Sequence, residues 1–193
     1  MRKDNQPEDI RNYGASGIVF DAVSIIITAI AMLSVVFTFG FRMVGVNGSS
    51  MENTLYTDDW LLVTPYYGEP QYGDIVISTK ETAAEGALVK RVIAVAGDEV
   101  MITDDDSVYV NGIKLDETYA LTRNTHGKGD RTYPVTVPEG CVMLMGDNRD
   151  VSWDSRYTSI GYIETEHLLG KARLRLSRDW NIYGNFTHDA TKD

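Results

Sequence analysis

A pair of adjacent serines and a lysine within an apolar run could together support acyl-transfer chemistry. Ser49 and Ser50 precede Met51 in the stretch VNGSSMENTL, and Lys90 lies in GALVKRVIAVAGDEV. A serine hydroxyl becomes a nucleophile when a neighbouring base removes its proton, and a neutral lysine amine can be that base in place of histidine. The serines could equally be ordinary turn residues.

Two structural roles are open for Lys90 on the pattern alone. On a strand it would share a face with aliphatic residues such as Leu88 and Val92. It could lie at a sheet edge and extend its amine to water. Alternatively it could be buried, and burial lowers a lysine pKa from about 10.4 by up to about 3–5 units. A buried Lys90 would then be a usable general base near neutral pH.

A third segment, GDNRDVSWDSRYTSIG at residues 146–161, concentrates hydrogen-bonding side chains after an apolar strand. These side chains could form a solvated turn with exposed ion pairs, each of which contributes little. They could instead form a buried polar network that positions other groups. The pattern does not decide between the two. The residues concerned are Asp147, Arg149, Asp150, Ser152, Asp154, Ser155 and Arg156.

The composition argues against several functional classes. The chain has 193 residues, a net charge of −10 and a pI of about 4.7, whereas a nucleic-acid-binding face needs a surplus of basic side chains. Cys141 is the only cysteine, so neither an intramolecular disulfide nor a multi-thiolate metal site can form. His126, His167 and His188 are widely spaced. We therefore expect no nucleic acid partner, no metal and no cofactor.

An uncharged run of 20 residues, AVSIIITAIAMLSVVFTFGF, extends from Ala22 to Phe41. A helix of this length spans about 30 Å at about 1.5 Å per residue, which matches the hydrocarbon core of a bilayer. The run is longer than the apolar part of a typical cleaved signal peptide, and no small-x-small cleavage site closes it. The sequence therefore predicts one membrane-spanning helix over residues 17–41.

Basic residues near the run predict its orientation, because lysine and arginine beside a span favour the cytoplasmic side. Three basic residues precede the run, whereas Arg42 is the only one that follows it before Lys80. We therefore expect residues 1–16 to be cytoplasmic and residues 42–193 to form an extracytoplasmic domain.

The chain after residue 42 has the pattern of a mainly β domain. Strand-like runs such as LLVT and IVIS are separated by a Gly-Glu-Pro breaker, and KARLRLS alternates charged and apolar residues. Asn111 and Gly112 between β-prone residues predict a two-residue hairpin turn. The polar, glycine-containing segment 117–133 is predicted to be a surface excursion.

Three segments, SMENTL, LVKRVIAVAGDEV and GDNRDVSWDSRYTSIG, resemble motifs of bacterial type I signal peptidases, in the single-span form of Gram-positive bacteria. The family motifs are Ser-Met-x-Pro-Thr-Leu, a Lys-Arg-Val-Ile segment ending in Gly-Asp, and Gly-Asp-Asn-Arg-x-x-Ser-x-Asp-Ser-Arg. The resemblance covers roughly residues 18–170. It implies a coiled antiparallel β-sheet catalytic domain with a smaller β cap, about residues 99–137, after one N-terminal transmembrane helix.

The resemblance also implies roles for individual residues. Ser50, directly before the methionine, would be the nucleophile and Lys90 the general base, with Ser152 hydrogen-bonded to the lysine amine. A supporting scaffold and turn would lie behind this dyad, formed by Asp154, Arg156, Arg91, Asp147 and Asn148. The residues expected next to the substrate are Gly48, Ser49 and Met51.

Two positions depart from the family pattern. Asn53 stands where the family usually has proline, and a proline would stiffen the backbone just after the nucleophile. Asparagine also suits turns, so the effect on Ser50 is open. Gly48 lies where some family members have a serine whose hydroxyl binds the oxyanion, so here backbone N–H groups would have to do so.

The function implied by the resemblance is a membrane-bound serine endopeptidase that cleaves signal peptides from exported preproteins through an acyl-enzyme. Its partners would be these preproteins and the lipid bilayer. Three alternatives are weighed: a catalytically inactive relative that acts as an assembly factor, a peptidase dedicated to a few surface proteins, and a self-cleaving protein. Both Ser50 and Lys90 are present, which argues against the first. No DNA-binding region is recognisable, which argues against a self-cleaving repressor.

Overall fold

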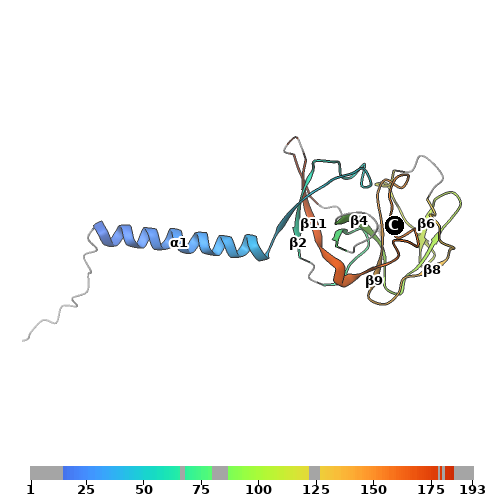
Figure 1. Cartoon of the computed structure of the whole chain (residues 1–193), viewed down its shortest axis with the longest axis horizontal. Helices are drawn as coiled ribbons and strands as arrows, with labels where there is room; N and C mark the ends of the chain where they lie inside the picture. The colour runs from blue at the N-terminus through green and yellow to red at the C-terminus, as the bar shows by residue number, and fades with distance from the viewer. Residues whose placement is uncertain are drawn as a thin grey trace, which may run out of the picture. The chain divides into compact units, whose positions relative to one another are not determined.

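The computed structural model describes residues 15–65, 68–79, 87–121, 127–177, 179 and 181–184. The chain divides into two compact units, Met1–Gly40 and Phe41–Asp193. The described part of the first unit is a single helix followed by a turn, and the second unit is built from β-strands (Figure 1).

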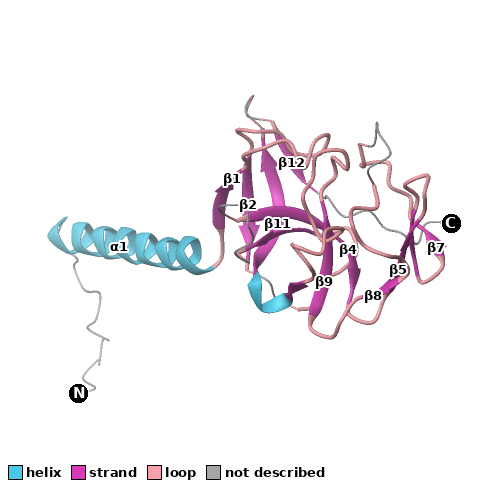
Figure 2. Cartoon of the chain, turned by 45° about the vertical axis from the view of Figure 1, so that its right-hand side comes forward, coloured by secondary structure: helices cyan, strands magenta, loops and turns pink. Residues whose placement is uncertain are grey.

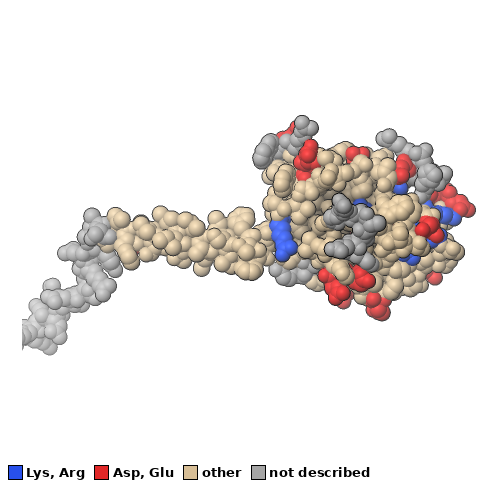
Figure 3. All heavy atoms as spheres, in the orientation of Figure 1, with Lys and Arg blue, Asp and Glu red and all other residues tan. Residues whose placement is uncertain are grey.

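Helix α1 (Ala15–Phe39) is long and apolar enough to cross a membrane. The mean hydropathy of Gly17–Phe39 reaches 2.5, and its large apolar side chains are exposed. On the face shown in Figure 3 the helix carries no charged side chain, whereas acidic side chains are scattered over the second unit. The helix ends at Phe39, because Gly40 forms a turn. It therefore stops before Phe41, the predicted end of the span.

A curled antiparallel sheet of eight strands forms most of the second unit (Figure 2). Its strand order is β1-β2-β11-β3-β4-β9-β10, and β12 pairs with β11. The strands are β1 (Arg42–Gly45), β2 (Trp60–Thr64), β3 (Ile75–Ser78), β4 (Leu88–Val95), β9 (Cys141–Met145), β10 (Ile163–Glu164), β11 (Leu168–Leu176) and β12 (Ile182–Gly184); a short 3-10 turn, Thr165–His167, links β10 to β11.

A second, smaller sheet has four strands in the order β7-β6-β5-β8. These strands are β5 (Glu99–Ile102), β6 (Val108–Val110), β7 (Ile113–Lys114) and β8 (Val135–Thr136). Asn111 and Gly112 connect β6 to β7 with φ values of 51° and 80°, as the predicted hairpin turn requires. The predicted fold class, a coiled antiparallel sheet with a smaller sheet and one N-terminal apolar helix, is confirmed.

Strand β4 occupies a central position, between β3 and β9, and contributes to two parts of the core. Val92 packs with residues of β3, β9 and the following turns, whereas Ile93 and Ala94 pack with the smaller sheet. A shift in register between Val92 and Ala94 lets the strand change the face it presents. From Arg91 onward β4 is consequently held between β3 and β9, whereas Leu88–Lys90 pair with β3 alone.

Candidate active site

The loop that carries Ser50 lies against the first half of β4. Lys90 is 4% exposed, and its Nζ donates a hydrogen bond to Ser50 Oγ at 2.8 Å. The neighbouring Ser49 is exposed, and its carbonyl accepts a hydrogen bond from Asn148 Nδ2 at 3.1 Å. Of the two serines, the structure therefore brings Ser50 to the lysine. The catalytic roles of Ser50 and Lys90 stay a prediction.

Burial lowers the pKa of the Lys90 amine below its ordinary value, because the ammonium loses its hydration. The charges of Asp154 and Asp147 oppose this shift, and the charge of Arg156 adds to it. The amine also donates to the carbonyl of Val89 at 3.2 Å. When the amine is neutral, the Ser50 hydroxyl can donate to its lone pair along the same 2.8 Å contact. The site thus suits transfer of a proton from serine to lysine.

A pocket of about 420 Å³ opens beside Ser50 and Lys90. One border is β1 with the turn that follows it, and the other is the start of β4. In the described part of the chain both borders are unpaired strand edges. Strand β1 ends the large sheet, and Leu88–Lys90 pair only with β3, because β9 joins from Arg91 onward. The apolar lining residues are Val44, Val46, Met51, Ala87, Leu88 and Val89.

Gly48 and Ser50 differ in the availability of their backbone N–H groups. The Gly48 N–H donates to Thr57 Oγ1 at 3.1 Å, and Gly48 has a φ of 99°, which glycine adopts without steric cost. The Ser50 N–H makes no hydrogen bond within the described residues. It is therefore available to a developing negative charge next to Ser50 Oγ.

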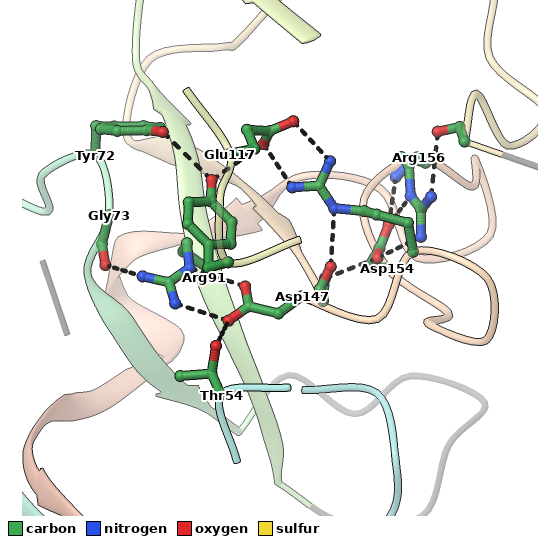
Figure 4. Close-up of polar contacts among 12 residues, drawn as sticks. Thr54, Tyr72, Gly73, Arg91, Glu117, Asp147, Asp154 and Arg156 are labelled. Carbon is green, nitrogen blue, oxygen red and sulfur yellow. Dashed lines mark hydrogen bonds and ion pairs between the residues drawn. The ribbon is translucent and has the colours of Figure 1, made fainter. Parts of the chain in front are cut away.

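An ion pair between Arg91 and Asp147 anchors the far side of the Ser50 loop (Figure 4). The guanidinium contacts the carboxylate at two points, Nε to Oδ1 at 2.8 Å and Nη2 to Oδ2 at 2.7 Å. Its Nη1 donates to the carbonyl of Gly73 at 2.9 Å. Thr54 Oγ1 donates to Asp147 Oδ2 at 2.5 Å, which joins the loop to this pair.

The segment after β9 binds the same loop through its backbone. The Asn148 N–H donates to the Ser50 carbonyl at 3.0 Å. Asn148 thus holds Ser49 through its side chain and Ser50 through its main chain. Met51 is 2% exposed and packs in the core with residues of β2, β3 and β11. This packing holds the loop against the sheet.

A second ion pair joins Asp154 to Arg156, and both side chains are fully buried. Their two contacts measure 2.8 and 2.9 Å, and the Gly146 N–H also donates to Asp154 Oδ2 at 2.9 Å. Burial alone would raise the pKa of Asp154, but the charge and hydrogen bonds of Arg156 lower it overall. The ion-paired side chains of segment 146–161 therefore form a buried polar network, while Val151, Trp153, Thr158 and Ser159 of the same segment are exposed.

Ser152 is placed differently from expectation. Ser152 is 3% exposed, but its Oγ has no hydrogen-bond partner among the described residues. The hydrogen bond to the Lys90 amine, implied by the family resemblance, is thus absent from this structure. Its hydroxyl still lies close enough to Asp154 to help lower the pKa of that carboxyl. The backbone of Gly146 lies directly beside Ser152 and Ser50, with no room for a side chain.

Residues 117–121 belong to the site, although they were predicted to start a surface excursion. Glu117 pairs with the buried Arg149, with contacts of 2.5 and 3.1 Å (Figure 4). Tyr119 is 7% exposed and its ring lies 4.0 Å from the Arg91 guanidinium carbon. Leu121 exchanges backbone hydrogen bonds with Asp147 and Arg149. The prediction failed for these residues because tertiary partners bury Tyr119 and pair with Glu117, although Thr118 stays exposed; residues 122–126 lie outside the described part.

Within the described residues, no three His, Cys, Asp or Glu side chains gather as a metal site. The described contacts centre on the Ser50 hydroxyl, the Lys90 amine and three ion pairs, Arg91 with Asp147, Arg156 with Asp154 and Arg149 with Glu117.

Comparisons with known proteins give the chain a family. The family model described as signal peptidase, peptidase S26, matches residues 19–177. The chain is 33% identical over 177 residues to a probable signal peptidase I-2 of Synechocystis, covering 86% of this chain and 77% of the relative. It is 35% identical over 166 residues to a signal peptidase I of Bacillus licheniformis, covering 81% and 87%.

Two further comparisons agree in name. Signal peptidase I T of Bacillus subtilis is 35% identical over 159 residues, which cover 77% of this chain and 80% of the relative. The crystal structure of a signal peptidase I from Enterococcus faecalis has 28% identity and a TM-score of 0.45, covering 55% of this chain and 98% of the other. On the strength of the family model and the sequence relatives, this chain belongs to the signal peptidase family, peptidase S26.

Proposed function

We propose that this chain is a membrane-anchored serine endopeptidase that removes signal peptides from exported preproteins, with Ser50 as nucleophile and Lys90 as general base. The observation that carries the proposal is the 2.8 Å contact between the buried Lys90 Nζ and Ser50 Oγ at the border of an open pocket. The names of the relatives support the substrate class.

The reaction begins when neutral Lys90 takes the hydroxyl proton of Ser50 while Oγ attacks the scissile carbonyl carbon. The carbonyl oxygen becomes an oxyanion, which the unpaired N–H of Ser50 stabilises. As the C–N bond breaks, the Lys90 ammonium returns its proton to the leaving amine, and an ester with Ser50 remains. Lys90 then takes a proton from water, whose oxygen attacks the ester; as the ester C–O bond breaks, the Lys90 ammonium returns this proton to Ser50 Oγ, and the new carboxyl end is released.

The substrate segment before the cleavage point binds as an extended strand between the two open edges beside the pocket. Main-chain hydrogen bonds to β1 and to Leu88–Lys90 hold its backbone, and the apolar lining receives small apolar side chains. This arrangement delivers the scissile carbonyl to Ser50 Oγ. Anchoring by α1 restricts the search for substrate to the membrane surface, where the apolar part of a preprotein also lies.

The topology proposal follows from the flanking charges. Residues 1–16 lie in the cytoplasm, the span 17–41 includes α1 from residue 17 to its end, and residues 42–193 form the extracytoplasmic catalytic domain with residues 99–137 as an inserted cap. A tag at the N-terminus of the full chain tests this in bacterial cells. Protease added outside spheroplasts should digest the domain and leave the tag intact.

The decisive test is cleavage of a preprotein with an Ala-x-Ala site by the full chain in detergent. We expect Ser50→Ala and Lys90→Ala to abolish cleavage, and Ser49→Ala, the matched control one residue away, to retain it. Mass spectrometry of the products would show a single cut after the second alanine. Loss of activity with Ser49→Ala but not with Ser50→Ala would reverse the assignment.

A wild-type protein that cleaves none of several preproteins would contradict general signal peptide processing. A peptidase dedicated to a few surface proteins, or an inactive assembly factor, would then account for the chain. Asn53→Pro is the next variant in that case. Within the described residues the Asn53 N–H makes no hydrogen bond, so the proline removes none.

A further inference from the structure

The loop that carries Ser50 runs from Val46 to Asp59, between β1 and β2. Its two ends are joined by backbone hydrogen bonds, from the Val46 N–H to the Asp59 carbonyl at 2.8 Å and from the Asp58 N–H to the Val46 carbonyl at 3.0 Å. This closure fixes where the loop begins and ends. The residues between need further contacts, because a long loop is otherwise free to adopt many conformations.

Contacts with Asp147 and Asn148 hold one side of the loop, as described above. A separate set holds the opposite side and comes from β11, outside all the family motifs. Arg175 on β11 donates from Nη1 to the carbonyl of Thr54 at 2.9 Å. The Arg175 Nε forms an ion pair with Asp59 Oδ2 at 2.7 Å.

Asp59 is suited to this role because it is 2% exposed and bonds within the loop as well as to Arg175. Its Oδ2 accepts a hydrogen bond from the Tyr56 N–H at 2.7 Å. The Arg175 guanidinium also contacts two aromatic rings: its carbon lies 5.3 Å from the centre of the Tyr56 ring and 5.1 Å from that of Tyr183 on β12. These contacts restrict the Arg175 side chain to a conformation in which its guanidinium reaches the Thr54 carbonyl.

Thr54 is the residue at which the two sets of contacts meet. Its hydroxyl donates to Asp147 and its carbonyl accepts from Arg175. The Thr54 N–H and the Leu55 N–H both donate to the Met51 carbonyl at 2.8 Å, so a displacement of Thr54 is transmitted to the residue that follows Ser50. Neither Arg175 nor Asp59 lines the pocket.

We propose that the ion pair between the partly buried Arg175 and the buried Asp59 positions the Ser50 loop for attack, acting through Thr54 and without contacting substrate. Both are positioning residues for the reaction proposed above, and the inference rests on that function. A displacement of about 1 Å in the nucleophile can lower a rate about 100-fold, while substrate binding to the two strand edges would be nearly unchanged.

The test compares full-length wild type, Arg175→Gln, Arg175→Lys and the control Arg173→Gln in detergent. Arg173 lies on the same strand but is exposed and donates to Thr64 Oγ1. We expect Arg175→Gln to lower kcat for a signal-peptide substrate at least tenfold, with KM within about twofold and the same pH midpoint. Arg175→Lys should recover part of kcat, and Arg173→Gln should match wild type.

Hydrogen exchange of the same four proteins supplies a readout that needs no activity. The amides of Thr54 and Leu55 should exchange faster in Arg175→Gln and not in Arg173→Gln. Unchanged exchange, or an unchanged kcat per folded molecule, would overturn the proposal. If the wild type cleaves no preprotein, the proposed function fails, and exchange of these amides alone decides whether Arg175 positions the loop.

Discussion

Lys90 Nζ and Ser50 Oγ lie 2.8 Å apart, although the two residues come from elements that are constrained in different ways. Lys90 is on β4, and the pairing of this strand with β3 at Lys90 and with β9 from Arg91 onward fixes the backbone that carries its side chain. Ser50 is on a turn, which has no such support. Several polar residues after β9 accordingly bind the turn and not the lysine, and the precision of the pair depends on them.

The rate of cleavage should follow deprotonation of Lys90. Because burial lowers the pKa of this amine, kcat/KM should rise with pH and reach half its limiting value below about 10.4, the ordinary lysine pKa. Initial rates from pH 5 to 10 with a peptide substrate give the midpoint. Lys90→Arg keeps its charge throughout this range and should be inactive. A midpoint at or above the ordinary lysine pKa would contradict a desolvated base.

Replacing Lys90 by methionine should stabilise the fold at neutral pH. The lowered pKa means that the folded state binds the Lys90 proton less tightly than the unfolded state does. The charged Lys90 therefore lowers the free energy of unfolding of the wild type. This loss of stability is largest at pH values below the pKa of Lys90 in the folded state, and it declines as the pH rises from there towards about 10.4, the pKa in the unfolded state. The gain from Lys90→Met should therefore shrink over that window.

Urea unfolding of both proteins at pH 7 and at pH 10 would measure this difference. Lys171→Met is not a suitable control, because Lys171 pairs with Asp74. Lys114→Met is better suited, since Lys114 is exposed on the short strand β7. A stabilisation by Lys90→Met that is the same at both pH values would contradict the expected linkage to the lysine proton.

The resemblance of the motifs to those of the family predicted which serine and which lysine meet, whereas strand periodicity alone left Lys90 open between an exposed and a buried position. The Asn111 and Gly112 turn was predictable from the sequence itself, because a two-residue hairpin turn is a local feature. The position of Glu117 was not, since its burial depends on Arg149, which is distant in sequence and reaches it only in the folded chain. The sequence of a polar segment does not reveal whether its side chains form hydrogen bonds with water or with a guanidinium inside the protein.

Arg175 and Thr54 illustrate the same limit. The alternation in KARLRLS predicts a half-buried strand, but the bulge between Ala172 and Leu174 determines which side chains reach the Ser50 loop. Ser152 differs from these two residues, because its position in the motif was recognised from the sequence. Its expected hydrogen bond to the Lys90 amine is nevertheless not formed. Contacts that depend on the exact rotation of a buried side chain are not encoded in spacing alone.

Removing the carboxylate charge of Asp154 should be among the more destabilising single changes. Asp154→Asn leaves the Arg156 guanidinium buried without a countercharge, which typically costs about 3–5 kcal/mol of stability. Asp104→Asn is the matched control, because Asp104 pairs with Lys128 while its own side chain is 98% exposed. Exposed pairs contribute little, so no measurable change in stability is expected there. Urea unfolding at pH 7 compares the two, and equal effects would contradict the importance of burial.

Gly146 should tolerate no side chain, because its backbone is packed between Ser50 and Ser152. A Cβ at this position would overlap the Ser50 carbonyl oxygen and the Ser152 side chain. Gly146 itself is held by hydrogen bonds from its N–H to Asp154 and from Arg149 to its carbonyl, so the clash must be relieved by moving the Ser50 loop. Gly146→Ala should therefore lower kcat at least tenfold and destabilise the domain by about 1–3 kcal/mol.

The control for this change is Gly184→Ala on β12. A Cβ there would lie 3.0 Å from Leu174 Cδ2, the end of a flexible side chain that can move aside. We expect near wild-type kcat and stability for Gly184→Ala, measured by peptide cleavage and thermal unfolding in the same detergent. A Gly146→Ala protein with wild-type kcat would mean that the Ser50 carbonyl can shift without disturbing Ser50 Oγ. The close packing of Gly146 would then not be needed to position the nucleophile.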